Sequence, residues 1–496
     1  MQNDNTTPNS FGMNDGDKSK PNYDFSIFNL DKRERISHDE ILNKIIEKLE
    51  PIDFKNIANP DGVPNFKIKN KHLIIITIEE ILRCAYVNRW GLCKRTGFIY
   101  LCNGEYWKEI EMEELQRFLG EAAEKLGVDK FNSKHYQFKE HLLKQFCSSA
   151  YIPLHPTGQD KVLINLRNGT FEIDENGGRL RPFSSSDFLT YQLPFGYDVT
   201  AKAPLFERFL NRVLPDVDKQ KVLAEYLAYI FFRNGTQSIK EEKMLVLYGT
   251  GCNGKSVVYE IVNALLGREN VSNYSLEKVT KDIGYTRAVL ANKLLNYVSE
   301  INKNIDTDAF KQLVSGERVE ARVIYSAPFI MERYAKFMAN CNELPKDVEQ
   351  TQAFFRRFLL IHFDVTIPEA EIDKELHTKI IKSELSGVFN WVLDGLSRFL
   401  KQKGFTHSAA IQKANDDYRR DSDSVQLFLT DNEFEFSESN SYALKDIYSE
   451  YKIYCQDCCY KPCSHKTFSE RLKGKGFSVI RKAQGMMVNA VKKSFF

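Results

Sequence analysis

The sequence has no apolar run that approaches the roughly 18 residues needed for a membrane-spanning helix. Its first residues are polar and lack the apolar stretch of a secretory signal. Glycine and proline, at 26 and 15 of 496 residues, are too few for a low-complexity or fibrous chain. The ten cysteines, without an export signal, are expected to be reduced thiols. These absences exclude membrane, collagen-like and disulfide-framed proteins, and they predict a cytoplasmic globular protein.

A large net charge is also lacking, because 69 Lys and Arg residues nearly balance 67 Asp and Glu residues and leave +2. Charge is nevertheless segregated near the C-terminus. Residues 416–440 carry a net charge of −6, and residues 471–496 contain seven basic side chains and no acid. Contacts of lysine and arginine with nucleic-acid phosphates carry no sequence information. We therefore predict that Arg471, Lys473 and Lys475 bind DNA, with a solvated surface or a subunit contact as the alternative.

Apolar patterns divide the chain into five predicted parts. Residues 1–22 are polar and form a disordered tail, and residues 23–198 combine helical spacing with short strands and Asn-Gly turns, which indicates an α+β domain. Residues 199–242 form a helical linker or collar. Residues 243–404 alternate apolar strands with helices, the pattern of an α/β sheet domain. Residues 405–496 end in helix, turn, helix and glycine-flanked strands, the order of a winged-helix domain.

A complete phosphate-binding motif follows the apolar strand at residues 244–248. Its eight residues are, in order, Gly249, Thr250, Gly251, Cys252, Asn253, Gly254, Lys255 and Ser256. A helical pattern then continues to Gly267, so the motif has the strand–loop–helix context of a Walker A loop, and a chance glycine-rich turn is a poor alternative. Glycines let the backbone approach phosphate oxygens, the lysine neutralises phosphate charge and the serine hydroxyl ligates Mg²⁺. The motif predicts ATP and Mg²⁺ as ligands.

An ATPase also needs an acid near this loop to hold the metal and polarise water. The apolar strand that begins at Lys293 ends in Ser299 and Glu300. Because Ser299 stands where many ATPases have a second acid, metal coordination is predicted to depend on Ser256 and Glu300. Glu300 and Lys255 are predicted catalytic residues. A strand-ending glutamate that is merely solvated is the alternative.

Three further motifs follow in order: the segment 311–322 (KQLVSGERVEAR), an apolar strand that ends in Asn342-Glu-Leu-Pro345, and the segment 354–363 (FFRRFLLIHF). With the Walker A loop and Glu300, this order resembles a superfamily 3 helicase, and more narrowly the primase–helicase proteins of phages, plasmids and large DNA viruses. The match is good over residues 243–365. It extends loosely upstream, and the C-terminal region is similar to the winged-helix end of the family.

The resemblance implies an AAA+-like P-loop domain in a hexameric ring that hydrolyses ATP and moves along single-stranded DNA at a replication fork. Asn342 would be the polar sensor of the γ-phosphate or the attacking water, with a role in the turn to Pro345 as the alternative. Arg357 would be the arginine finger that acts in the neighbouring subunit, with Arg356 as the second candidate. The Asp-x-Asp patterns before residue 243, at residues 15–17 and 216–218, lie in the polar tail and in the predicted helical linker, not on a predicted strand, so primer synthesis is assigned to a separate primase or polymerase partner.

The family also carries a β-hairpin that lines the pore of the ring. Residues 319–325 and 329–334 could be its arms. A pore loop needs positive charge for phosphates and an aromatic ring for bases, and Arg322, Tyr325 and the more distant Lys311 fit that need. Viral relatives have a lysine at the tip that this sequence lacks, and ordinary hairpin packing is the alternative for Tyr325.

Two other interpretations stay open. A replication initiator could use ATP mainly as an assembly switch and unwind little, whereas a P-loop small-molecule kinase would need neither the arginine pair nor the basic C-terminus. The cysteines between Cys455 and Cys463, with His465, form one cluster, but structural zinc joins two separated ligand pairs. No metal is therefore assigned there.

Overall fold

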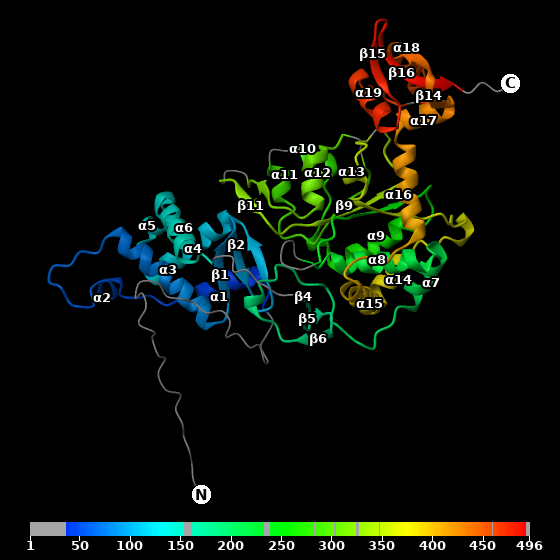
Figure 1. The fold of residues 1–496 in the computed structure, drawn as a ribbon. Coiled ribbons are helices and arrows are strands. Elements are labelled where there is room, and N and C mark those ends of the chain that lie inside the picture. The colour runs from blue at the N-terminus through cyan, green and yellow to red at the C-terminus, as the bar shows by residue number, and fades with distance from the viewer. Residues whose placement is uncertain are drawn as a thin grey trace. The chain divides into compact units, whose positions relative to one another are not determined.

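The computed structural model describes residues 36–152, 161–232, 239–281, 284–301, 304–323, 327–346, 348–458 and 460–492. The predicted tail at residues 1–22 lies outside these ranges. The chain forms two compact units, the first of residues 1–154 and 182–190 and the second of residues 155–181 and 191–496 (Figure 1). Among the described helices, none combines the length and the apolar character that crossing a bilayer requires.

The first unit combines helices with one antiparallel sheet of order β1-β2-β3. Its elements are α1 (His38–Lys48), α2 (Phe54–Ala58), α3 (Asn70–Val87), β1 (Gly91–Arg95), β2 (Phe98–Cys102), β3 (Trp107–Ile110), α4 (Met112–Leu126), α5 (Lys130–Lys134), α6 (Tyr136–Ser149) and the 3-10 turn η2 (Ser185–Asp187). The helical spacing and short strands predicted for this part of the chain are present, for example in α1 and β2.

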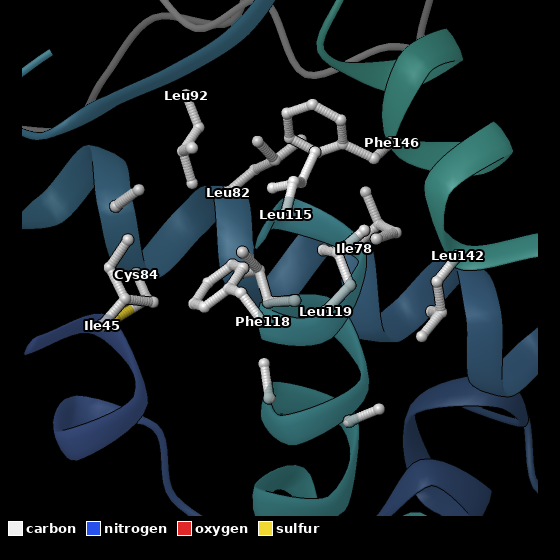
Figure 2. Close-up of a cluster of buried hydrophobic side chains, with 14 of the residues drawn as sticks. Ile45, Ile78, Leu82, Cys84, Leu92, Leu115, Phe118, Leu119, Leu142 and Phe146 are labelled. Atoms are coloured by element: carbon white, nitrogen blue, oxygen red, sulfur yellow. The ribbon is translucent and has the colours of Figure 1, made fainter. Parts of the chain in front are cut away.

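Apolar residues three and four positions apart on the helices build the core of this unit. On α4, Leu115, Phe118 and Leu119 recur at this spacing and are at most 3% exposed. Figure 2 shows them clustered with Ile78 from α3 and Phe146 from α6. Gly127 then ends α4 in the left-handed conformation, with φ of 108°.

The second unit is built on a five-stranded parallel sheet of order β13-β7-β12-β9-β8. The strands are β7 (Met244–Tyr248), β8 (Val271–Ser272), β9 (Leu295–Val298), β12 (Lys336–Cys341) and β13 (Phe358–His362). The apolar run of β7 is buried from Met244 to Leu247, as expected for an inner strand of a sheet covered on both faces. This mixed α/β architecture with a parallel sheet confirms the coarse fold class predicted from the sequence.

Helices and short hairpins surround this sheet (Figure 1). They are β4 (Val162–Leu166), β5 (Gly169–Asp174), β6 (Gly177–Arg181), α7 (Pro204–Val213), α8 (Val217–Tyr229), α9 (Lys255–Leu266), η3 (Arg268–Asn270), α10 (Leu276–Lys281), α11 (Tyr285–Ala288), α12 (Thr307–Val314), β10 (Val319–Ala321), β11 (Phe329–Met331), α13 (Gln352–Phe355), η4 (Glu369–Glu371), α14 (Leu376–Ser383), α15 (Leu385–Gln402) and α16 (Ala409–Asp421). The β4–β6 sheet groups with the second unit, because Phe171 packs against Phe389 and Asn165 bonds the backbone of Tyr191. The domain boundaries drawn from the sequence stay predictions.

The C-terminal residues form a small sheet with three helices. The elements are α17 (Ser424–Asp431), β14 (Phe434–Ala443), α18 (Leu444–Asp457), α19 (His465–Gly474), β15 (Val479–Lys482) and β16 (Gly485–Lys492), with sheet order β14-β16-β15. Phe428, Tyr451, Phe468 and Val488 form its core and are fully buried. The basic C-terminal segment therefore contains two strands of this sheet and is not a detachable tail.

Candidate nucleotide-binding site

One cavity of about 1060 Å³ lies at the carboxyl ends of β7, β9 and β12. Most of the Walker A loop, from Gly251 to Ser256, lines it, together with Glu300 and Asn342. These residues are up to 91 positions apart, from Gly251 to Asn342. Because the three strands run parallel, the residues that follow each of them meet at one edge of the sheet. The structure thus brings together the loop, the acid and the sensor candidate that the sequence predicts.

The loop has the backbone conformation that its glycines allow. Gly249, Gly251 and Gly254 have φ of 151°, 104° and 87°, and Cys252 between them has φ of 46°. A Cβ at Gly249 would lie 2.3 Å from the carbonyl oxygen of Phe363, and one at Gly254 would lie 2.9 Å from Val213 Cγ1. Glycine is therefore required at both positions for close packing as well as for φ.

The side chain of Lys255 points back across this loop. Its Nζ donates to the carbonyl oxygen of Gly249 at 2.6 Å and to Asn253 Oδ1 at 3.0 Å. Asn253 is fixed in turn, because its Nδ2 donates to the carbonyl oxygen of Phe363 at 3.1 Å. Burial lowers the pKa of Lys255. Both acceptors are neutral, so the ammonium charge is held at the cavity without being cancelled and can attract an anion.

The two predicted metal ligands reach the cavity from different elements. Ser256 is the second residue of α9, and Glu300 lies two positions beyond the end of β9. Both side chains line the cavity and belong to exposed residues. A hydroxyl and a carboxylate are the oxygen ligands that Mg²⁺ takes beside nucleotide phosphates. The donor set therefore fits that ion.

Sequence reasoning missed a second asparagine at this site. Asn340 is 7% exposed on β12, and its Nδ2 donates to the backbone carbonyl of Lys255 at 3.2 Å. Its Oδ1 is buried and has no hydrogen-bond partner among the residues that the structure describes. A buried amide oxygen without a partner is costly. Side chains two positions apart on a strand point to the same face. The pattern Asn-Cys-Asn at the end of an apolar strand could therefore have indicated that Asn340 faces the site together with Asn342.

Helix α7 forms the other wall of the cavity, which the sequence did not predict. Leu205, Arg208, Phe209 and Arg212 line it, and Arg212 pairs with Glu371 across the site. The start of α7 is fixed by Glu384, which is 6% exposed and accepts hydrogen bonds from the backbone N–H groups of Leu205 and Phe206 at 3.0 and 2.9 Å. Arg208 and Arg212 are four positions apart, which places them on the same face of the helix. That spacing is the one feature of the sequence that indicates a polar face on α7.

The two arginine-finger candidates differ sharply in exposure. The Arg357 side chain is 7% exposed, donates from Nη2 to Ser315 Oγ at 2.8 Å and pairs with Glu242 at 3.2 Å. The Arg356 side chain is 57% exposed and pairs with the same carboxylate at 2.6 Å. Neither lines the cavity. The sequence ranks Arg357 first, but Arg356 has the more exposed guanidinium of the two.

The predicted DNA contacts on the second unit are mostly engaged by other side chains. The hairpin of β10 and β11 is present, but Tyr325 lies outside the described residues. Lys311 pairs with Asp308 at 2.8 Å and Glu349 at 3.2 Å, and the guanidinium of Arg322 lies 5.6 Å from the ring centroid of Tyr285. These pairings lower the charge that Lys311 can offer to DNA.

The three predicted DNA contacts near the C-terminus also differ in whether an acidic side chain pairs with them. Lys475 donates to Asp423 Oδ2 at 2.6 Å, and Arg471 lies 3.9 Å from the same carboxylate. Asp423 also caps α17, so these two bases join elements of their own domain. Lys473 is exposed on α19, and it remains the most accessible of the three predicted contacts.

Comparisons with known proteins agree with the motifs. The family described as D5 N terminal like matches residues 79–215, and a family of unknown function, DUF5906, matches residues 247–357. A protein of Acanthamoeba polyphaga mimivirus, provisionally named as helicase L207/L206, is 23% identical over 436 residues. These matches fit a primase–helicase family. The match covers 80% of this chain but only 43% of the mimivirus protein, so the chain spans less than half the length of that relative.

Solved structures of the NrS-1 C-terminal region are also similar to the chain. An A-form apo structure is 13% identical, with a TM-score of 0.45, and the match covers 85% of this chain and all of that one. The apo structure of residues 305–718 has a TM-score of 0.43 at the same identity, with coverage of 86% and 100%.

Proposed function

We propose that the chain is an ATP-dependent DNA helicase of a phage, plasmid, virus or other mobile element, active in replication. The observation that carries this proposal is the single cavity that holds the phosphate-binding loop, Glu300 and Asn342 together. The family resemblance supplies DNA as the substrate and a ring of subunits as the working state. The parallel sheet supports an AAA+-like P-loop domain, and the C-terminal order of helices and strands supports a winged-helix domain.

Each residue of the cavity has a distinct part in ATP hydrolysis. The loop amides and Lys255 bind the β- and γ-phosphates, since backbone N–H groups and an ammonium together make a strong anion site. Ser256 and Glu300 would hold Mg²⁺, which neutralises the charge that develops on the phosphate oxygens. Glu300 orients the attacking water, and Asn342 with Asn340 senses the γ-phosphate. The apolar side chains of Leu205 and Phe209 give the nucleobase a surface against α7.

ATP turnover with and without single-stranded DNA, measured on size-fractionated protein, tests this function. We expect hydrolysis in the oligomeric fraction and several-fold stimulation by DNA, because a translocating motor couples the two. Hydrolysis that is indifferent to DNA would contradict the helicase and favour a small-molecule kinase. Unwinding of a tailed duplex separates the helicase from an initiator that uses ATP only as an assembly switch.

The role of Glu300 gives a sharper prediction. Glu300→Gln removes the negative charge and keeps the shape, so nucleotide should still bind while hydrolysis falls by about 10²-fold or more, as for loss of a general base. Glu343 lines the same cavity, and Glu343→Gln is the matched control that should hydrolyse ATP like the wild type. Fluorescent-nucleotide binding and phosphate release are the measurements. Loss of binding in the Glu300 variant would make Glu300 chiefly a metal ligand.

A further inference from the structure

The most exposed large apolar side chains of the first unit include two aromatic rings at the junction of α5 and α6. Phe131 is 84% exposed and Tyr136 is 64% exposed, although only four residues separate them. Neither ring belongs to the buried core of the unit, and Tyr136 packs against a neighbouring ring, that of His135, with centroids 5.0 Å apart. Rings of this kind in a mostly polar setting indicate a binding surface rather than a core.

Lysines are frequent in two segments of the chain that meet near these rings. Residues 62–78 and residues 130–139 contain no Asp or Glu. The segments meet where Asn132 Nδ2 donates to Asn70 Oδ1 at 3.4 Å, which places the start of α5 beside the start of α3. The exposed bases that result, together with the two rings, form the basic–aromatic surface. It consists of Lys67, Lys69, Lys71, Lys130, Phe131, Lys134 and Tyr136.

The charge of this surface is largely uncompensated within the described part of the first unit. Only Lys134 has an acidic partner there, Glu124 at 3.7 Å. Asp129, which adjoins the second segment, is engaged as the cap of α5, where its carboxylate accepts from the N–H groups of Phe131 and Asn132. The first turn of α3 contains no acid either, so the positive end of that helix adds to the potential.

The segment that carries Lys67, Lys69 and Lys71, which leads into the first turn of α3, is held in place. The ring of Phe66 stacks on His72 with centroids 5.3 Å apart, and the backbone N–H of Lys69 donates to His72 Nδ1 at 3.2 Å. The charges are therefore presented on a folded support and need not be ordered at the moment of binding, which lowers the entropic cost of association.

We propose that the basic–aromatic surface binds single-stranded DNA, as a contact of the helicase separate from its ATPase cavity. The lysines contact the phosphates of one strand, and successive bases stack on the rings of Phe131 and Tyr136. Stacking of this kind does not depend on sequence, because every base has a face for it. Duplex DNA would leave the rings unused, since its bases already stack on one another. Two copies of this surface would bring five lysines of one chain against five of the other. The repulsion between these like charges disfavours self-association.

Equilibrium binding of a fluorescent oligothymidine to the full chain, without nucleotide, tests the rings. Phe131→Ala with Tyr136→Ala should weaken binding on the order of 25-fold or more, since each stacked base contributes at least about 5-fold. Val87, which is 64% exposed at the far end of α3, supplies the matched control Val87→Ala with unchanged affinity. Carrying every variant in a Lys255→Ala background removes the ATPase cavity from the result. Unchanged DNA affinity in the aromatic variant would reject this contact and leave the proposed ATPase function standing. Absence of ATP hydrolysis would reject the ATPase function and leave this contact standing.

The lysines are tested by the salt dependence of the same binding. Changing Lys67, Lys69 and Lys71 to glutamine should lower the slope of log affinity against log salt by about 2, at about 0.7 per phosphate contact on a single strand. The control changes Lys44, Lys48 and Lys55 of the same unit to glutamine and should leave the slope unchanged. Photocrosslinking from bromouracil-containing DNA should label Phe131 or Tyr136, which mass spectrometry can locate.

Three outcomes would overturn the proposal. One is wild-type affinity of the double aromatic variant at all salt concentrations. Another is equal weakening of duplex and single-strand binding by that variant, which would assign the surface to duplex phosphates. The last is a change of oligomeric state in light scattering with DNA affinity unchanged, which would make it a protein interface. Circular dichroism melting curves should match the wild type for each variant, since all of these side chains are exposed.

Discussion

Replacing Lys255 by alanine is expected to abolish ATP hydrolysis while the chain stays folded. The Nζ of Lys255 is the one ammonium among the residues that line the described cavity, and it is aimed across the phosphate-binding loop by Gly249 and Asn253. Loss of a single preorganised charge at a reacting centre costs about 10²- to 10³-fold in rate. Loss of ground-state phosphate binding adds to this, so turnover should fall below about one thousandth of the wild type.

The fold should tolerate this change. Lys255 opens α9, and alanine is the best helix former. The side chain makes no ion pair within the described residues, so no acid is left unpaired, and the cost is limited to its hydrogen bonds to two neutral acceptors, Gly249 and Asn253, at about 0.5–1.5 kcal/mol each. Lys401→Ala, at an exposed position near the end of α15, is the matched control and should turn over ATP normally. Phosphate release and melting temperature are the measurements. Wild-type turnover in the Lys255 variant would reject the assignment of the ATPase site.

Local patterns were sufficient to predict the core of the site. The strand at residues 244–248, the loop that follows it and the helix up to Leu266 are contiguous, so their spacing alone fixes their geometry. Glu300 and Asn342 follow apolar strands, and a parallel sheet brings such positions to one edge. The prediction of α/β architecture is confirmed for the same reason: alternation of strands and helices is a local signal.

Long-range pairing could not be predicted from the sequence. Nothing local to Arg357 shows that Ser315 and Glu242 bury it, and nothing near Lys475 shows that Asp423 neutralises it. The contribution of α7 was hidden for the same reason, because the contacts of Glu384 span about 180 residues. The glycine-flanked strands of the basic segment are predicted by local pattern, but nothing local shows that β16 pairs with β14, about 50 positions upstream.

The arginine finger is the prediction that tests ring assembly and catalysis together. An arginine that acts on the neighbouring subunit's ATP is worth about 10³-fold or more. Arg356 is exposed and held to Glu242 by an ion pair at the surface, which costs little to break. Arg356→Ala should therefore fold with an unchanged melting temperature, bind ATP normally and lose hydrolysis by about that factor.

Arg357→Ala should behave differently, because Arg357 is buried against Ser315 and Glu242. Leaving buried polar partners unsatisfied costs about 1–3 kcal/mol, so its melting temperature should fall. Some activity would be lost in either variant, and activity alone cannot tell a finger from a structural support. The melting temperature separates the two arginines, and the mixing experiment below identifies the finger.

Mixing each arginine variant with Lys255→Ala subunits tests action in trans. The Lys255 variant has a dead cavity and intact arginines, whereas the Arg356 variant has an intact cavity and no finger. In mixed rings, some intact arginines face intact cavities, so two inactive proteins should together regain part of the activity. Recovery with Arg356→Ala but not Arg357→Ala would assign the finger to Arg356, and the opposite pattern would restore the ranking from the sequence. If neither mixture recovers, although mass measurement shows mixed rings, the arginines act within their own subunit. The trans-finger hypothesis would then be wrong.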